Sequence, residues 1–550
     1  MRVAAAALAA LSLSAPLAGQ ASKVGALAPK VSEAALRAHL AFLSDDLLEG
    51  RGTGQRGGEL AVLYLRTELA RMGLKPANGD SYLQPVKIAG VKTDPAATHL
   101  TFTGGSEPIS LAYGPEMVVG TGTTRTRIPF DAPLVFMGYG ISAPEERWDD
   151  YKGADGKDID CKGKVLVMMV NDPQPTAAEP NRFGGKSLTY YGRWTYKYEE
   201  AARRGAAGVI LIHTDPSATY GWSVVQNSNG GERFQLADSG QPQNPIQGWV
   251  TNASAERIFK AAGQDLDGLR AQAETRGFHP VPLAVKLSGE LVSQVRTIDQ
   301  ANVAGVVPGT DPKLKDQVVI YTAHWDHLGI DPELVKQGKD GIYNGAVDNG
   351  SGTATVLAMA EAAAKHPAKR SQMFLFVCAE EQGLLGSAAY GAHPLWPADK
   401  TACDLNLDAI NWVGPTRDIG APGADRTSLG ATAAAVAKAM GLVISKPTPD
   451  IGGGYFRSDH FSLAKDGIPA FSVESGEDFL GDAKAQKAKA DSYEQRYHQP
   501  SDAYDPAWDL RGMAQMGQFT LNLGYAVADA PGMPSWKPGD PFGAARAKGK

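Results

Sequence analysis

Seven residues with metal-binding or acid–base side chains follow apolar runs or occupy loops in the second half of the sequence. They are His324, Asp326, Asp348, Glu380, Glu381, Asp408 and His498. Imidazole and carboxylate ligands together suit zinc, and an excess of carboxylates suits two ions that share one bridging acid. Two metals about 3.5–4 Å apart can clamp both the attacking water and the polarised carbonyl of a hydrolysis reaction. The pattern therefore predicts a hydrolytic metal centre.

The adjacent acids Glu380 and Glu381 end the apolar run MFLFVCAEE. Neighbouring side chains of an extended segment point apart, so the two acids need not share a role. One can bind a cation, and the other can act as a general base whose pKa is tuned by its surroundings. In the same way, His324 can bind a metal while Asp326, two residues on, orients it. Spacing alone does not choose between His460, in the segment RSDH, and His498 as the last imidazole.

Alternating strands and helices should hold these residues. From Ala301 onward, apolar strand-like runs alternate with helical runs such as TATVLAMAEAAAKH. That alternation predicts an α/β domain with a mixed, largely parallel central sheet flanked by helices. Since ligands in such sheets gather at the carboxyl ends of strands, the predicted residues should meet at one edge. Near the start, Ser32 should cap a helix whose apolar stripe is Leu36, Leu40, Leu43 and Leu47, and a second helix should cover about 58–72.

Residues 119–285 have a different character. Strand-like runs such as GKVLVMMV and AGVILIHTD alternate with turns rich in Gly, Asp and Asn, which predicts an inserted β-rich domain. We therefore expect a leader at 1–21, the N-terminal part of the main domain at 22–118, the insert at 119–285 and the catalytic domain at 286–528. The last segment, 529–550, is rich in Pro and Gly and is predicted to be disordered.

Composition narrows the class of protein. The 550 residues carry a formal net charge of −6 and no basic block, so nucleic acid is not expected as a partner. The start, MRVAAAALAALSLSAPLAGQA, is typical of a cleaved signal peptide, which predicts a periplasmic or secreted protein without a membrane span. Three cysteines do not make a disulfide framework. The sequence does not indicate the oligomeric state.

Six ordered segments resemble the co-catalytic di-zinc aminopeptidase family, which also holds glutamate carboxypeptidase and the transferrin receptor ectodomain. They are AHWDHLG, NGAVDNGSG, AEEQGLLGS, NLDAI, RSDHFSLAKDGIPA and YHQPSD. The resemblance covers about residues 295–525, and LSDDLLEGRGTGQRG is similar to the family's opening helices. The insert resembles a protease-associated (PA) domain.

The resemblance implies a role for each candidate residue. His324 and Asp408 would hold one Zn²⁺, and Glu381 and His498 would hold a second. Asp348 would bridge both ions. Glu380 would be the general base, and Asp326 would orient His324. The resemblance thus favours His498 over His460, and it implies a cis peptide bond between Asp348 and Asn349.

These features together predict an exported zinc exopeptidase, an aminopeptidase that releases N-terminal residues from peptides with a zinc-activated water. A carboxypeptidase or dipeptidase on the same site is the alternative, and it should show arginines that bind a substrate carboxylate. Arg457, next to SDH, is a candidate for that role. A receptor-like homologue without catalysis should lack metal ligands, and none is missing from the matching segments.

Overall fold

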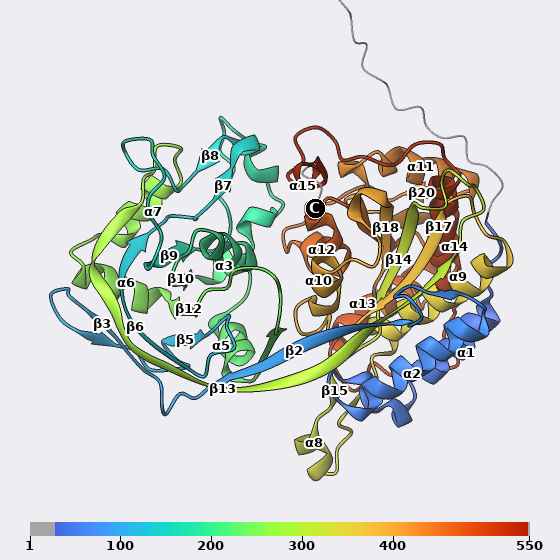
Figure 1. Cartoon of the computed structure of the whole chain (residues 1–550), viewed down its shortest axis with the longest axis horizontal. Coiled ribbons are helices and arrows are strands. Elements are labelled where there is room, and N and C mark those ends of the chain that lie inside the picture. The colour runs from blue at the N-terminus through green and yellow to red at the C-terminus, as the bar shows by residue number, and fades with distance from the viewer. Residues whose placement is uncertain (1–27, 548–550) are drawn as a thin grey trace, which may run out of the picture.

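The computed structural model describes residues 28–547, so the predicted leader at 1–21 lies outside the described residues. The chain forms two parts that lie side by side, and two long strands run between them along the lower edge (Figure 1). These are β2 (Leu83–Thr93) and β13 (Val281–Val307). They pair antiparallel from Leu83 with Val303 to Thr93 with Ser293. One continuous ladder therefore links both parts.

The main sheet lies in the part on the right of Figure 1. Its strands, in spatial order after β2 and β13, are β17 (Ser371–Val377), β14 (Val318–His324), β18 (Thr401–Leu407), β21 (Ala470–Ser475), β19 (Asp418–Gly420) and β20 (Val443–Ile444). The four central strands from β17 to β21 are parallel, and antiparallel strands lie at both sides. Every residue of β14, β17 and β18 is buried. The prediction of a mixed, largely parallel sheet is confirmed.

Helices cover both faces of this sheet. On one face lie α1 (Glu33–Leu43), α9 (Gly352–Lys365) and α14 (Arg511–Ala528), with α2 (Arg56–Arg71) beside them and α11 (Leu429–Ala439) against α14. On the other face lie α10 (Leu385–Ala392) and α12 (His460–Lys465). Ser32 caps α1 as predicted, accepting a hydrogen bond from the amide of Ala35 at 3.2 Å. Leu47 does not join the buried stripe, because α1 ends at Leu43 and leaves its side chain 75% exposed.

The second part is built on its own sheet with its own apolar cores. Its strands are β3 (His99–Thr103), β4 (Ile109–Ser110), β5 (Met117–Gly120), β6 (Arg127–Phe136), β9 (Val165–Met169), β10 (Gly208–His213), β12 (Ile246–Thr251) and the first half of β13. Its helices include α3 (Trp194–Arg203), α5 (Trp222–Gly230), α6 (Asn252–Ala261) and α7 (Leu266–Ala273).

The second sheet extends beyond the predicted edges of the insert, 119 and 285. Residue 119 falls inside β5, and residue 285 falls inside β13. The second sheet already begins at β3, and it uses β13 as far as Val292, which pairs with Arg127. β13 continues through the crossing without a break, so no turn in the sequence marks the point at which it passes from one sheet to the other.

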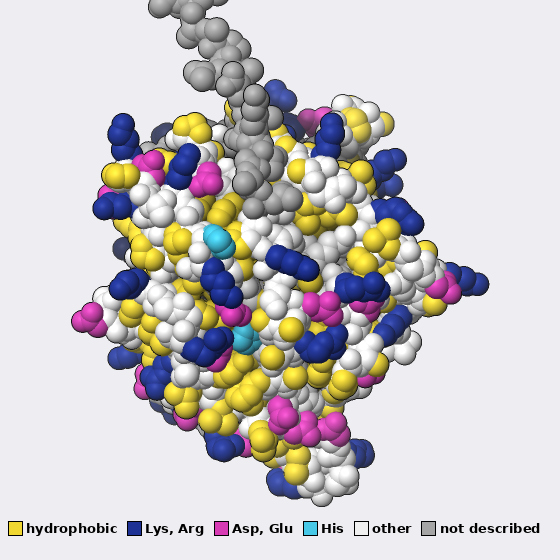
Figure 2. All heavy atoms as spheres, turned by 90° about the vertical axis from the view of Figure 1, so that its right-hand side faces the viewer, with side chains coloured by type: hydrophobic (Ala, Val, Ile, Leu, Met, Phe, Trp, Pro, Cys, Tyr) yellow, Lys and Arg dark blue, Asp and Glu magenta, His cyan; other side chains and the backbone are white. Residues whose placement is uncertain are grey.

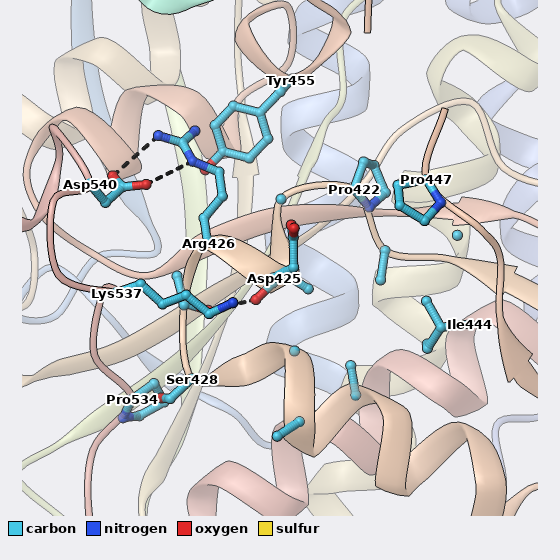
Figure 3. Close-up of a pocket in the computed structure, with 18 of the residues that line it drawn as sticks. Pro422, Asp425, Arg426, Ser428, Ile444, Pro447, Tyr455, Pro534, Lys537 and Asp540 are labelled. Carbon is cyan, nitrogen blue, oxygen red and sulfur yellow. Dashed lines mark hydrogen bonds and ion pairs between the residues drawn. The ribbon is translucent and has the colours of Figure 1, made fainter. Parts of the chain in front are cut away.

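The C-terminal segment is ordered as far as it is described, in contrast to the predicted disorder at 529–550. Trp536 is 9% exposed, and its indole Nε1 donates to the carbonyl of Gly467 at 2.8 Å. Asp540 forms a two-pronged ion pair with Arg426, at 2.9 and 3.1 Å (Figure 3). After buried Phe542, the short helix α15 (Gly543–Ala547) lies between the two parts (Figure 1). Two aromatic anchors and an ion pair outweigh the Pro- and Gly-rich composition here.

Three further observations concern the cysteines, the helices and one face of the surface. Cys161, Cys378 and Cys403 are free and buried. Within residues 28–547, no helix is long and apolar enough to cross a membrane. The face on the right-hand side of Figure 1 mixes basic and acidic side chains (Figure 2).

Candidate metal centre

The central strands deliver the candidate residues to one edge of the main sheet. His324 is the last residue of β14, and Asp408 follows directly after β18. The glycine-rich loop that bears Asp348 leads into α9, and Thr353 at the start of α9 donates to the carbonyl of His324 at 2.7 Å. Because β14, β17 and β18 are parallel, their carboxyl ends coincide. All seven predicted residues lie in this one cluster.

Asp348 stands at the middle of the cluster. Its Oδ1 lies 3.2 Å from Nε2 of His324, and its Oδ2 lies 3.2 Å from Nε2 of His498. One carboxylate thus offers an oxygen to each of two imidazoles on opposite sides. The peptide bond from Asp348 to Asn349 is cis, as the resemblance implies.

One half of the cluster surrounds His324. Its Nε2 lies 3.2 Å from Oδ1 of Asp408 and 4.0 Å from Oε2 of Glu380. The second oxygen of Asp408 accepts a hydrogen bond from the hydroxyl of Ser458 at 2.6 Å. That bond fixes which oxygen of Asp408 faces His324.

The other half surrounds Glu381. Its Oε2 lies 3.0 Å from Nε2 of His498, and its Oε1 lies 2.5 Å from Nδ1 of His327. The ring of His498 stacks on that of Tyr497, with centroids 3.9 Å apart. His327 is fully buried, and its Nε2 has no hydrogen-bond partner among the described residues. His327 is not among the seven candidates, because its place in a loop three residues after His324 gives no sign in the sequence that it reaches Glu381.

Glu380 and Glu381 face different halves, but not for the predicted reason. The strand β17 ends at Val377, so neither acid belongs to an extended segment. The chain turns at Ala379, whose φ of 53° lies in a region that non-glycine residues seldom adopt. Residues 380–383 then form a turn. It is this turn that separates the two side chains.

Burial and charge shift the acid–base equilibria of the cluster. Burial, together with the negative charges of Asp408 and Glu381, raises the pKa of Glu380 well above its usual range. Burial opposes ionisation of Asp348 too, but the hydrogen bonds from His324 and His498 prevail and lower its pKa. For His498, the two carboxylate contacts outweigh burial and raise the pKa to about 10.

Asp326 supports the cluster in a way that the sequence analysis did not predict. Nδ1 of His324 lies 3.1 Å from the backbone carbonyl of Asp326 and 3.9 Å from its carboxylate. The carboxylate instead accepts the backbone amide of Glu380 at 3.2 Å and the hydroxyl of Thr53 at 3.2 Å. Burial raises the pKa of Asp326 to about 6. Its side chain therefore holds the start of the Glu380–Glu381 turn, while its backbone orients His324.

A buried arginine beneath the centre had no recognised role in the sequence. Arg51, which is 1% exposed, donates to the carbonyls of Trp325 at 2.8 Å, Asn344 at 2.6 Å and Gly345 at 2.8 Å. These carbonyls belong to the two loops that carry Asp326 and Asp348. Burial lowers the pKa of Arg51 to about 10. The segment LSDDLLEGRGTGQRG contained the signal, an arginine between glycines, but nothing in it showed what the side chain reaches.

Two further polar residues hold the bridging loop. Asp502 accepts the backbone amides of Val347 and Asp348, each at 3.1 Å. Asn349 donates to the carbonyl of Leu407 at 2.9 Å and so ties this loop to the end of β18. The position of Asp348 is therefore set from both sides.

His460 does not reach the cluster. Its ring packs edge-on against Tyr455 at 4.7 Å, and burial lowers its pKa to about 3. Neither of its nitrogens has a partner among the described residues. The neighbouring Asp459 is fully buried, and burial raises its pKa to about 7. The geometry thus places His498, and not His460, beside Asp348 and Glu381.

Two groups of side chains in the cluster are each spaced so that they could hold a metal ion. Ligand atoms of His324, Glu380 and Asp408 lie within 4.8 Å of one another, as do those of His327, Asp348 and Glu381. Four carboxylates packed this closely repel one another unless positive charge compensates them. His498 is the better imidazole for the second group, since its Nε2 contacts both Asp348 and Glu381 while His327 contacts only Glu381.

Part of the sequence is similar to known peptidases. Residues 302–523 match the model of peptidase family M28. The probable leucine aminopeptidase 1 of Trichophyton verrucosum is 28% identical over 208 residues, which are 36% of this chain and 53% of the relative. Aminopeptidase YwaD of Bacillus subtilis is 36% identical over 110 residues, covering 20% of this chain and 21% of the relative. The chain thus spans about half the length of the curated leucine aminopeptidase.

Among solved structures, the aminopeptidase from Aneurinibacillus sp. strain AM-1 aligns over 92% of this chain and 97% of that chain, with a TM-score of 0.46 and 18% identity. The part of the sequence matched by the family model, residues 302–523, contains His324, Asp348, Glu381, Asp408 and His498. Residues 302–523 of this chain are therefore similar to peptidase family M28.

Proposed function

We propose that the protein is an exported di-zinc aminopeptidase that removes N-terminal residues from peptides. The observation that carries the proposal is the position of Asp348, which presents one oxygen to His324 and the other to His498. A carboxylate placed in this way suits the bridge between two ions. The names of the leucine aminopeptidases that the chain resembles support the reaction class.

The metal-holding roles divide as the two halves of the cluster suggest. His324 and Asp408 would hold one zinc ion, Glu381 and His498 would hold the other, and Asp348 would bind both. When bound, such a pair lowers the pKa of a water molecule and polarises the scissile carbonyl. His327 keeps Glu381 oriented through its Nδ1 contact.

Glu380 is the proposed proton carrier. Its carboxylate has no hydrogen-bond partner among residues 28–547, so both oxygens are available to a water or substrate. Burial and neighbouring acids raise its pKa, which favours a base that takes a proton from water and returns it to the leaving amine. Asp326 fixes its backbone amide at 3.2 Å and so sets the position of the carboxylate.

The negative charges of the cluster would favour binding of the substrate's N-terminus. The cluster combines Asp348, Glu380, Glu381 and Asp408 at one edge of the sheet, and such acids favour a substrate's ammonium group. All ligand residues are present, which argues against a receptor-like protein without catalysis. We further propose that the second part is a PA-like insert that narrows access to this edge.

N-terminal acetylation tests the direction of cleavage. Unblocked aminoacyl amides should be hydrolysed, and acetylation of the α-amine should abolish turnover, because it removes the charge that the acids attract. Amidation of the C-terminus should leave turnover detectable. Rapid cleavage of acetylated peptides with free carboxylates, and none of C-terminal amides, would instead identify a carboxypeptidase.

A further inference from the structure

A segment of the second part, 187–190, binds a loop of the main domain, 450–458. The amide of Leu188 donates to the carbonyl of Asp450 at 2.9 Å, and the hydroxyl of Ser187 accepts the amide of Asp450 at 3.0 Å. Both backbone polar groups of Asp450 therefore have their partners across the boundary between the two parts.

Tyr190 of the same segment lies among three phenylalanines of the main domain. Its ring centroid is 5.4 Å from that of Phe461, 5.7 Å from that of Phe542 and 6.4 Å from that of Phe456. Phe456 belongs to the loop, Phe461 to α12 and Phe542 to the C-terminal segment. Aromatic rings at these distances attract one another beyond the effect of their burial. The ring of Tyr190 thus joins the loop and α12 to the second part.

The hydroxyl of Tyr190 makes a separate contact. It donates to one oxygen of Glu199 in α3, and the other oxygen of Glu199 pairs with Lys465 of α12 at 3.1 Å. Both members of this ion pair are partly exposed, so the pair should contribute little to stability. The aromatic ring, rather than the hydroxyl, is therefore the main link between Tyr190 and the main domain.

The loop leads to the metal centre. The carboxylate of Asp450 accepts the amides of Gly454 at 2.8 Å and Tyr455 at 3.1 Å, which shapes the turn before Ser458. The hydroxyl of Ser458 then donates to Oδ2 of Asp408 at 2.6 Å. Asp450, which the second part binds through its backbone, therefore sets the path of the chain to Ser458 through its side chain.

The contacts of Tyr190 lie on both sides of Ser458 in the sequence. Phe456 precedes Ser458 by two residues, and Phe461 follows it by three. The carbonyl of Ser458 accepts the amide of Phe461 at 3.0 Å. A shift of either phenylalanine would therefore move Ser458 and the carboxylate of Asp408 that it binds.

The outer side of the loop is open. Ile451 is exposed, and a Cβ atom built on Gly452 would meet no atom of the described residues within 4 Å. A groove of about 2820 Å³ borders the loop. Tyr455 anchors the far end of the loop to the main domain, since its hydroxyl donates to the first carbonyl of β21 at 2.8 Å and Arg426 lies over its ring at 4.6 Å (Figure 3). Loss of the contacts with the second part should therefore loosen the loop without releasing it.

We propose that segment 187–190, chiefly through the ring of Tyr190, positions Asp408 for the metal ion that it would share with His324. Tyr190 acts through Ser458 and is therefore a positioning residue. The inference rests on the proposed di-zinc function and extends it, because the second part then supports the metal centre besides narrowing access to it. A hydrogen-bond partner of a metal ligand typically contributes about 10- to 100-fold to metal affinity, and Tyr190, one contact further out, should contribute about tenfold.

Zinc affinity measures this link without catalysis. Titration of metal-free protein with Zn²⁺ against a competing chelator gives a Kd for each ion. Tyr190→Ala should weaken binding of one ion about tenfold and leave the other unchanged. Tyr190→Phe, which keeps the ring and loses only the hydroxyl contact with Glu199, should bind both ions as the wild type does.

Two more variants complete the set. Tyr113→Ala is the matched control, because Tyr113 is a partly buried tyrosine of the second part whose hydroxyl donates to the carbonyl of Asn229 at 3.2 Å, and it should leave both affinities unchanged. Ser187→Ala covers the case in which Tyr190→Ala does not fold. It removes the acceptor of the Asp450 amide and should weaken the same ion about fivefold, as for the loss of one hydrogen bond.

Ser458→Ala separates action through Ser458 from a general loss of stability. It removes the donor to Asp408 and should weaken one ion about 10- to 100-fold. Tyr190→Ala, added to Ser458→Ala, should weaken that ion no further, because the connection to Asp408 is already lost.

Zinc affinities of Tyr190→Ala equal to those of the wild type would overturn the proposal, as would equal weakening of both ions. Equal losses from Tyr190→Ala with and without Ser458→Ala would overturn the path through Ser458. A wild-type protein that binds no zinc would refute the proposed di-zinc function and this inference with it. Zinc binding without peptide hydrolysis would refute only the proposed function and leave the affinity comparison readable.

Discussion

Replacement of Glu380 by Gln changes one oxygen to an amide nitrogen in a side chain that is 12% exposed and 4.0 Å from Nε2 of His324. No described residue hydrogen-bonds to that carboxylate, so the amide breaks no protein contact. The substitution should remove the proton carrier while it preserves the fold and the ligands of both proposed ions.

The size of the effect follows from these surroundings. A positioned general base typically contributes about 10²- to 10⁴-fold to the rate, so kcat should fall by that factor, or about 2.7–5.4 kcal/mol in activation free energy. The stability of the metal-free protein, in contrast to kcat, should increase in Glu380→Gln. Folding raises the pKa of Glu380, so the unfolded metal-free protein loses this proton at a lower pH than the folded protein does. The free energy of unfolding therefore falls as the pH rises above the pKa of Glu380 in the unfolded chain. Metal-free Glu380→Gln should therefore have a higher Tm than wild type at pH 7.

Hydrolysis of an unblocked leucyl amide, metal analysis and thermal denaturation test this prediction together. Glu381→Gln is the matched comparison, because it should lose part of its bound zinc and recover activity at high zinc concentration. If Glu380→Gln keeps more than about a tenth of wild-type kcat, or both variants lose metal equally, the assigned division of roles is wrong.

Three further predictions concern two buried residues that stabilise the fold and the cleavage of the leader. Arg51→Met leaves the buried carbonyls of Trp325, Asn344 and Gly345 without a donor, so it should lower the free energy of unfolding by about 3–5 kcal/mol. Denaturant titration measures this change, and replacement of the exposed Arg56 by Met, the control, should change the free energy of unfolding little. Equal effects of the two substitutions would contradict the role of Arg51. Trp536→Ala should lower the free energy of unfolding by about 3–5 kcal/mol, whereas Lys537→Ala, at an exposed position, should leave it unchanged. If Trp536→Ala does not change the free energy of unfolding, the tail is disordered, as the sequence predicted. N-terminal sequencing of exported protein should begin near Ser22, directly after Ala21, and an intact Met1 would refute cleavage of the leader.

The edge of the sheet at which the candidate residues meet could be predicted from sequence. Apolar runs that end in His324 and Asp408 predict parallel strands, and the carboxyl ends of parallel strands coincide. The choice between His460 and His498 could not be made from spacing. It depends on the chain's path after α13 (Ala483–Asp491), which returns His498 to Glu381 while His460 begins α12 beneath Tyr455.

Other features depend on contacts between distant segments. The turn at residues 380–383 separates the side chains of Glu380 and Glu381, yet an apolar run that leads into two acids is equally typical of a longer strand. The contacts of Arg51 span about 290 positions in the sequence and leave no local pattern. Likewise, Trp536 is anchored by Gly467, and a segment rich in Pro and Gly does not reveal such a partner.

The zinc content of the purified mature protein tests the central claim most directly. Metal analysis should find close to two zinc ions per chain, and Asp348→Asn, which replaces the carboxylate between His324 and His498, should lose affinity for both. Chelation should abolish hydrolysis of an unblocked leucyl amide, and added Zn²⁺ should restore it. A fully active protein with at most one tightly bound ion would contradict the two-metal centre.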